Sequence, residues 1–162
     1  MRGGRFCAGV NPVFSLSFVE NPDSERFLFD AKTEIVGKIR LGDFEEYFAA
    51  DVTFWSANEY RAQWREGLSR TCDGLAKSCV LTSVRNPETA TFFQAWPIYR
   101  FGSEVIIQNR LLMLDQFDEP FLFSRLYDFV LPHRATSEDG AALSQWNIPI
   151  AVIEEFVSSG LD

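Results

Sequence analysis

The sequence has 162 residues, of which 46% are hydrophobic and 15% aromatic, and its 23 acidic against 15 basic residues give a formal net charge of −8. This length suits a single domain over residues 1–162, and the aromatic content excludes a disordered chain. Nucleic acid and anionic membranes bind through clustered Lys and Arg, so the acidic balance disfavours both. It favours a basic partner protein, unless the acidity serves only solubility.

The cysteine pattern and the start of the chain predict a cytoplasmic protein. Cys7, Cys72 and Cys79 form no CxxC pair, so no disulfide framework is expected. The apolar residues after the basic start are interrupted by polar residues and a proline, unlike a secretory signal. No segment has the length and apolar character of a membrane span. We expect residues 1–12 to be flexible.

Strand-like segments dominate the first third of the chain. Residues 13–20 alternate apolar with small polar residues and predict a first strand. Residues 26–32 fit a short strand or a helical turn. Residues 34–44 alternate again, with a turn at residues 42–43. Residues 44–55 are rich in aromatic residues, and the spacing of their apolar residues does not decide whether the segment begins as a strand or as a helix.

The clearest predicted helix begins after Ser56. Glu59 follows three residues later, which is the spacing of a capping box, in which each side chain accepts a hydrogen bond from the other residue's amide. Large apolar residues then recur at helical spacing, namely Tyr60, Trp64 and Leu68. The helix is expected to end near residues 72–74.

Strands return after this helix. Residues 78–85, 91–102 and 104–114 are rich in β-branched and aromatic residues, and their short connections predict an antiparallel meander. Residues 123–131 predict another strand, and Pro149 lies near the first turn of a short C-terminal helix. These elements together predict an α+β fold: a twisted antiparallel sheet with one main helix packed on a face and a short C-terminal helix.

The sequence offers little catalytic machinery. His133 is the only histidine, and we interpret it as a loop residue because no GxSxG elbow supplies it with a nucleophile. Cys72 and Cys79 have no neighbouring histidine and are interpreted as buried or half-buried thiols. The sequence contains neither a calcium loop nor a phosphate-binding loop. We therefore predict no metal, no cofactor and no catalytic residue.

An enzyme stays an alternative because adjacent acids occur in pairs, among them those at residues 45–46, 138–139 and 154–155. Neighbouring residues point in different directions, so adjacency alone does not bring two carboxylates to one bond. A small hydrolase would have to combine carboxylates from distant segments. Two acids would then share one pocket and have shifted pKa values.

A second alternative is a small-molecule binding module built on aromatic residues, above all on FWSANEYRAQW at residues 54–64. This stretch combines four large rings with one arginine, Arg61, and one glutamate, Glu59. Rings four residues apart on a helix normally pack against a sheet. We therefore interpret the stretch as the buried face of a core helix rather than a ligand site.

The order of several short blocks resembles one protein family more than any single motif does. The residues that carry the resemblance are Gly42, Asp43, Phe44, Glu46 and Phe48; Trp55, Tyr60, Gln63 and Trp64; Trp96, Pro97, Tyr99 and Arg100; and Val105, Gln108 and Asn109. In this order they resemble the immunity proteins of bacterial contact-dependent growth inhibition systems (CdiI type), over about residues 13–157. The terminal SQWNIPIAVIEEF is also similar, with Gln145 where the family has an acid.

The resemblance implies a cytoplasmic antidote without enzymatic activity. Such a protein binds the C-terminal toxin domain of a cognate effector in a one-to-one complex and blocks its active site. Many of these toxins are nucleases with basic grooves, which an acidic inhibitor can occupy in place of nucleic acid. The expected contacts are acids on exposed loops, Asp115, Asp118 and Glu119, with Glu45 and Glu46 as a second group. Framework roles are expected for Trp55, Tyr60 and Trp64.

Overall fold

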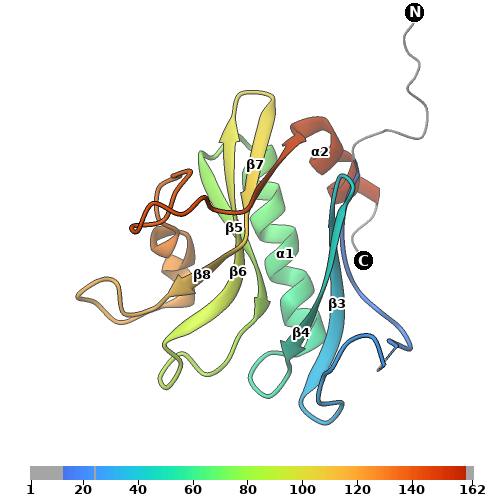
Figure 1. The fold of residues 1–162 in the computed structure, drawn as a ribbon. Coiled ribbons are helices and arrows are strands. Elements are labelled where there is room, and N and C mark those ends of the chain that lie inside the picture. Colours follow the sequence, from blue (N-terminus) through green and yellow to red (C-terminus); the bar gives the residue numbers. More distant parts are fainter. Residues whose placement is uncertain (1–12, 24, 160–162) are drawn as a thin grey trace, which may run out of the picture.

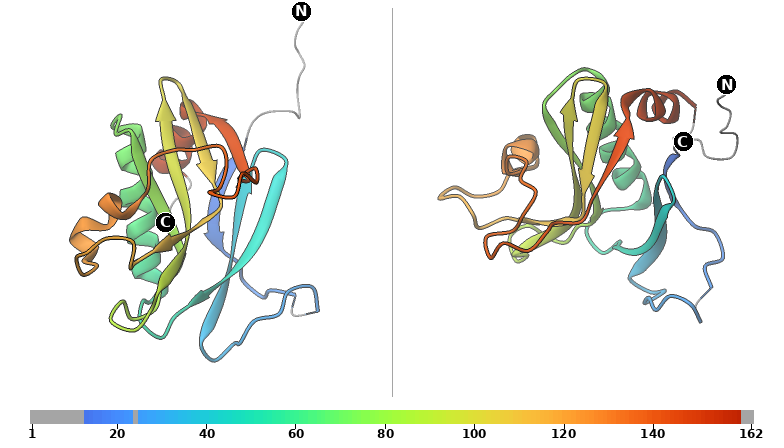
Figure 2. Two further views of the ribbon diagram at one scale, coloured as in Figure 1. Left: turned by 60° about the vertical axis from the view of Figure 1, so that its left-hand side comes forward. Right: turned by 45° about the horizontal axis from the view of Figure 1, so that its top comes forward.

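The computed structural model describes residues 13–23 and 25–159, so Cys7 and the tail predicted to be flexible lie outside the described residues. Figure 1 shows strands on either side of a long helix, α1 (Ala57–Cys72). The predicted α+β class, with antiparallel strands and one main helix, is confirmed. The strands divide into a three-stranded and a five-stranded sheet, and the right-hand view in Figure 2 shows α1 between them.

The three-stranded sheet contains β2 (Phe14–Phe18), β3 (Glu34–Leu41) and β4 (Phe44–Asp51), in that order. A two-residue turn joins β3 to β4, and Gly42 has the positive φ of 65° that such a turn favours. Residues 44–55, whose apolar spacing fits either a strand or a helix, therefore begin as a strand. Residues 26–32 do not form a strand: turns lie at residues 25–26 and 31–33, and residues 28–30 have no regular secondary structure.

A glycine lets the aromatic side chains of this sheet reach α1. Gly37 pairs with Phe18 on one side and with Phe48 on the other. A Cβ at Gly37 would overlap with the ring of Phe48, so the ring lies over β3 only because this position has no side chain. Phe18 and Phe48 both contact Trp64 of α1, with ring centroids 4.8 and 6.2 Å away.

The five-stranded sheet contains β5 (Lys77–Ser83), β6 (Phe92–Phe101), β7 (Glu104–Gln108), β8 (Arg110–Met113) and β9 (Gln145–Pro149). Strands β5, β6 and β7 form the predicted antiparallel meander. The strand predicted over residues 104–114 is interrupted at Asn109. Its two parts, β7 and β8, nevertheless continue along the same edge of β6. The sequence pattern does not predict β9, which pairs with β7.

Helix α1 begins with the predicted capping box. The amide of Glu59 donates to the hydroxyl of Ser56 at 3.3 Å, and the amide of Ser56 donates to the carboxylate of Glu59 at 3.0 Å. At the other end, Arg100 of β6 donates to the carbonyl of Thr71 at 2.8 Å and to that of Cys72 at 3.0 Å. Both ends of the helix are thus satisfied by side chains.

The buried face of α1 closes the free edge of β5, which pairs with β6 on one side only. Gln63 accepts from the amide of Leu81 at 2.8 Å and donates to the carbonyl of Cys79 at 2.9 Å. The indole of Trp64 donates to the carbonyl of Leu81 at 2.7 Å. These side chains supply the hydrogen bonds that a neighbouring strand would otherwise make.

Two further residues fix the position of α1. The hydroxyl of Tyr60 accepts from the amide of Val84 at 2.8 Å and donates to the carbonyl of Asp51 at 2.6 Å, so it joins the ends of β5 and β4. A Cβ at Gly67 would overlap with the carbonyl oxygen of Cys79, so this glycine permits the close approach of helix and strand. The predicted core stripe is confirmed, since at most 1% of the surface is exposed in each of Tyr60, Trp64 and Leu68.

The strand predicted over residues 123–131 is wrong. Residues Phe123–Phe129 instead form a 3-10 helix, η1. Apolar residues recur at every third position of this segment, which matches the three residues per turn of a 3-10 helix. Leu126 and Phe129 are buried, and Phe123 is half-buried.

The predicted C-terminal helix is confirmed as α2 (Ile150–Ser159), which begins directly after Pro149. It contacts α1 and β2. Phe156 of α2 packs edge-on against Phe14 of β2, with ring centroids 5.1 Å apart. The end of the described chain thereby returns to its first strand.

Candidate partner-binding surfaces

The acids predicted as the main contacts lie in the loop between β8 and η1, here called the acidic loop (residues 115–122). Asp115, Asp118 and Glu119 are all exposed. Glu119 forms an ion pair with Arg125 at 2.9 Å, and Arg125 also bonds to Asp128 at 3.1 Å. The hydrogen bond to Asp128 and the charge of Glu119 raise the pKa of Arg125. Arg125 of η1 therefore lies between the carboxylates of Glu119 and Asp128, and its pair with Glu119 anchors the acidic loop to η1.

The second predicted group, Glu45 and Glu46, lies on β4. Their side chains point to opposite faces of the strand because neighbouring strand residues alternate. Glu45 is exposed and lies 3.7 Å from the ammonium of Lys38. Glu46 is half-buried, and burial raises the pKa of its carboxyl group. Of the two glutamates, only Glu45 is thus exposed.

The two predicted groups do not form one patch. In Figure 1 the acidic loop leaves β8 at the left of the molecule, whereas the turn before Glu45 lies on the other side of α1. The views in Figure 2 agree with this separation. A partner that contacts both groups would have to extend across the face between them.

A surface that the sequence interpretation missed is the groove between α1 and η1, here called the α1–η1 groove. It has a volume of about 250 Å³. Its walls include Trp55 and Phe123, whose ring centroids are 5.1 Å apart, and two exposed acids of α1, Glu59 and Glu66. The spacing of the two acids, seven residues on a predicted helix, could have indicated a shared face. The opposite wall could not be foreseen, because η1 was predicted as a strand.

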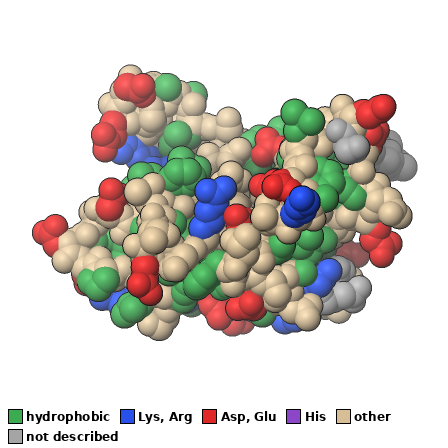
Figure 3. Space-filling model, turned by 90° about the horizontal axis from the view of Figure 1, so that it is seen from below, with side chains coloured by type: hydrophobic (Ala, Val, Ile, Leu, Met, Phe, Trp, Pro, Cys, Tyr) green, Lys and Arg blue, Asp and Glu red, His purple; other side chains and the backbone are tan. Residues whose placement is uncertain are grey.

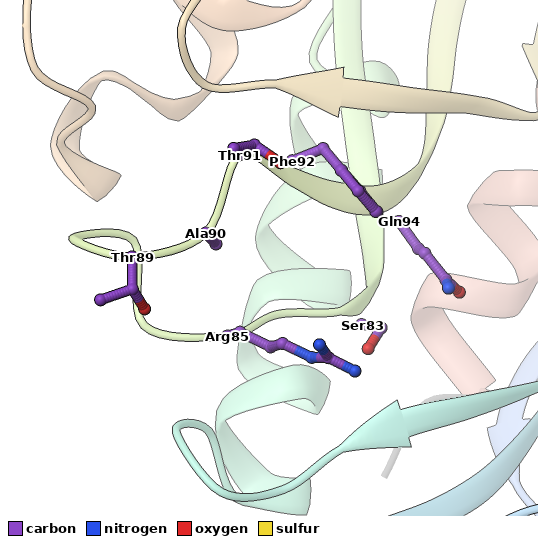
Figure 4. A pocket seen from close by; sticks show the side chains of 7 residues that line it. All are labelled: Ser83, Arg85, Thr89, Ala90, Thr91, Phe92 and Gln94. Carbon is purple, nitrogen blue, oxygen red and sulfur yellow. The ribbon is translucent and has the colours of Figure 1, made fainter.

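A second hollow, of about 310 Å³, lies at the hairpin between β5 and β6. Figure 4 shows the side chains of Arg85 and Gln94 extending toward the side on which Ser83 lies. The guanidinium of Arg85 is 3.3 Å from the carboxylate of Asp51, which is only 10% exposed. Asp51 also accepts from the amide of Thr53 at 2.8 Å. Because Asp51 already balances the charge of Arg85, this hollow has little attraction for an anion.

Acidic side chains are not gathered in one place on the face seen from below. Figure 3 shows them scattered between hydrophobic and basic side chains on that face. The net charge of −8 therefore does not by itself locate a contact surface. The acidic loop and the α1–η1 groove both place apolar side chains next to their acids. In the loop these are Phe117 and Leu122, which are 40% and 54% exposed.

The residues considered for catalysis have structural partners. His133 lies 3.2 Å from the amide oxygen of Gln145 and against the ring of Tyr99. Burial raises the pKa of Cys79 to about 12, so its thiol is protonated at neutral pH. Two acids outside the predicted pairs, Glu59 and Glu66 of the α1–η1 groove, also have partners: Glu59 is held by the helix cap, and Glu66 accepts from the hydroxyl of Tyr127 at 2.7 Å.

Over residues 13–23 and 25–159, no group of three or more His, Cys, Asp or Glu side chains is arranged to hold a metal ion. No helix in the described part of the chain is long and apolar enough to cross a membrane.

Comparisons with known proteins are consistent with one another. A family model described as the CdiI N-terminal domain matches residues 50–156. The protein named Immunity protein CdiI of Enterobacter cloacae subsp. cloacae is 22% identical over 121 residues, which is 75% of this chain and 83% of that protein. A chain of the solved CdiA-CT/CdiI toxin and immunity complex from Enterobacter cloacae superposes with a TM-score of 0.78 at 20% identity. The superposition covers 91% of this chain and 97% of that chain.

Proposed function

Because the chain belongs to the CdiI N-terminal domain family, we propose that it is an immunity protein that binds and neutralises the toxin domain of a cognate CdiA-type effector. The observation that carries this proposal is the family match, which runs from the end of β4 through α1 and the five-stranded sheet into α2. The similarity to a chain of a toxin and immunity complex supports the same fold.

The mechanism that we propose is occlusion in the cytoplasm, in a one-to-one complex that blocks the toxin's active site. We further propose that the toxin is a nuclease. A nuclease groove is basic because it holds phosphates, and the net charge of −8 suits a protein that occupies such a groove. Charge complementarity of this kind accelerates association.

We assign the first contacts to the acidic loop. Asp115, Asp118 and Glu119 are exposed, and Phe117 and Leu122 add apolar area beside them. A charged rim next to apolar side chains is the usual composition of a protein interface. Glu45 is kept as a secondary contact, while the half-burial of Glu46 argues for a framework role.

Co-expression with the toxin domain encoded immediately upstream tests the function. Growth should be rescued when the intact chain is present, and continued killing despite soluble chain would contradict an immunity role. The purified toxin domain should also degrade nucleic acid, and an equimolar amount of the chain should stop the degradation. A toxin without nuclease activity would contradict the nuclease assignment alone.

The contact assignment is tested by the variant Asp115→Asn/Asp118→Asn/Glu119→Gln. Its association rate with the purified toxin domain at low salt should fall about tenfold, because steering by charge is lost. The control Glu154→Gln/Glu155→Gln removes two exposed acids from α2 and should leave the rate almost unchanged. Equal rates for both variants would show that the acidic loop is not the contact.

A further inference from the structure

The α1–η1 groove combines aromatic walls with two acids. The rings of Trp55 and Phe123 lie 5.1 Å apart with an angle of 30° between their planes. Phe54 stacks on Phe123 with ring centroids 6.1 Å apart. The faces of aromatic rings carry negative potential and attract cations. The groove of about 250 Å³ is large enough for one long side chain.

The carboxylates of Glu59 and Glu66 are held in place by neutral donors. Glu59 accepts from the amide of Ser56 at 3.0 Å, and Glu66 accepts from the hydroxyl of Tyr127 at 2.7 Å. Burial and the bond to Glu66 raise the pKa of Tyr127, so the phenol stays protonated and remains the donor. Neither bond neutralises a charge. Among the described residues, no ion pair involves Glu59 or Glu66.

A nearby cation of the chain itself is occupied elsewhere. Arg70, one turn beyond Glu66 on α1, lies over the ring of Tyr127 at 3.9 Å. It also donates to the carbonyl of Lys77 at 3.3 Å. The residues that line the groove include two acids and no Lys or Arg. The groove is therefore an aromatic slot with two oriented negative charges.

On the premise of the proposed function, we propose that the α1–η1 groove receives an arginine side chain of the toxin domain. The guanidinium lies between Glu59 and Glu66, and its planar face packs against Trp55 or Phe123. The groove adjoins the acidic loop through η1, because Glu119 is paired with Arg125 of that helix. The arginine would thus bind in the same interface as the acidic loop, whose charge accelerates association with the toxin domain.

The chemistry of the groove favours arginine over other occupants. A guanidinium is planar, stacks on aromatic rings and offers several donors to carboxylates, and it sheds water more readily than an ammonium does. A lysine would supply only a point charge and no stacking plane. A neutral or acidic side chain would leave two carboxylates desolvated and unpaired, which is costly.

The test uses the full chain and the purified toxin domain encoded immediately upstream. The variant Glu59→Gln/Glu66→Gln removes both charges, while glutamine keeps the capping box and can still accept from Tyr127. Its dissociation constant should rise about tenfold to a hundredfold, mainly through faster dissociation. The control Glu154→Gln/Glu155→Gln removes the same charge from α2 and should change the constant less than about twofold.

A second variant tests the groove without removing an acid. Ala62 is exposed and lines the groove, so Ala62→Arg places a guanidinium of the chain itself beside the two carboxylates. This variant should weaken toxin binding to a similar extent because the site is already filled. Changing each exposed arginine of the toxin to lysine should identify one whose loss weakens binding to the intact chain but not to Glu59→Gln/Glu66→Gln.

The outcomes separate the two proposals. If the intact chain binds the toxin and both groove variants bind as tightly as the control, the groove assignment is overturned and the immunity function stands. If the intact chain does not bind the toxin, the immunity function fails and the groove assignment fails with it. Weaker binding of both variants, with a matching toxin arginine, supports the assignment.

Discussion

The junction of α1 with β5 and the region of the acidic loop with η1 use polar side chains in opposite ways. At the junction, Gln63 and Trp64 bond to backbone groups inside the molecule. In the acidic loop and η1, the carboxylate of Glu119 meets the side chain of Arg125 at the surface. The residues that carry the family resemblance include those of the junction and none between 115 and 131. The blocks of the family resemblance therefore coincide with the scaffold, and the exposed charges of the acidic loop lie outside them.

The largest expected effect is loss of the junction's hydrogen bonds. Gln63→Leu leaves the amide of Leu81 and the carbonyl of Cys79 buried without their partner. The free energy of unfolding should fall by about 2 to 5 kcal/mol. Chemical denaturation, with the midpoint read by circular dichroism, measures this. The control Arg125→Gln breaks exposed ion pairs at η1 and should leave the midpoint unchanged. An equal loss of unfolding free energy in both variants would contradict the difference between the junction and η1.

A smaller effect with an unusual sign is expected at Gly67. Replacing a helical glycine by alanine normally stabilises a helix by about 1 kcal/mol. Here the added Cβ overlaps with the carbonyl oxygen of Cys79, and overpacking of this kind costs about 1 to 3 kcal/mol. Gly67→Ala should therefore lower the thermal midpoint. The reverse change at exposed Ala62, Ala62→Gly, should lower it too, so a rise in either variant would contradict the interpretation.

The smallest expected effect distinguishes the two neighbouring glutamates of β4. Burial raises the pKa of Glu46, so the folded chain holds this proton more tightly than the unfolded chain does. Stability contributed by Glu46 is therefore greatest below its ordinary pKa and declines as pH rises through the raised value. Glu46→Gln should remove this decline in a series of unfolding midpoints between about pH 4 and about pH 7. Glu45→Gln, at the exposed neighbour, should retain it.

Local patterns were sufficient to predict α1, because its capping box and its apolar stripe lie within thirteen residues, from Ser56 to Leu68. The meander from β5 to β7 was predicted for the same reason, since its connections are short. The division into two sheets was not predicted. It depends on contacts between segments far apart in the sequence, such as the bond from the amide of Val84 to the hydroxyl of Tyr60, which no local period encodes.

The candidate contacts were predictable only as exposed acids. Asp115, Asp118 and Glu119 are indeed exposed, but the difference between Glu45 and Glu46 required the burial of each side chain. The α1–η1 groove could not be predicted, since its two walls come from segments far apart in the sequence. The spacing of three apolar residues in Phe123–Phe129 was the available signal for η1.

The closure of β5 by side chains of α1 has a consequence for solubility. An open strand edge offers unpaired amides and carbonyls to other chains, and β5 carries the apolar stretch Cys79, Val80 and Leu81. Helix α1 covers this edge and so keeps the strands of other chains from pairing with β5. Substitutions that loosen the helix should therefore first appear as concentration-dependent aggregation, before the rest of the sheet unfolds.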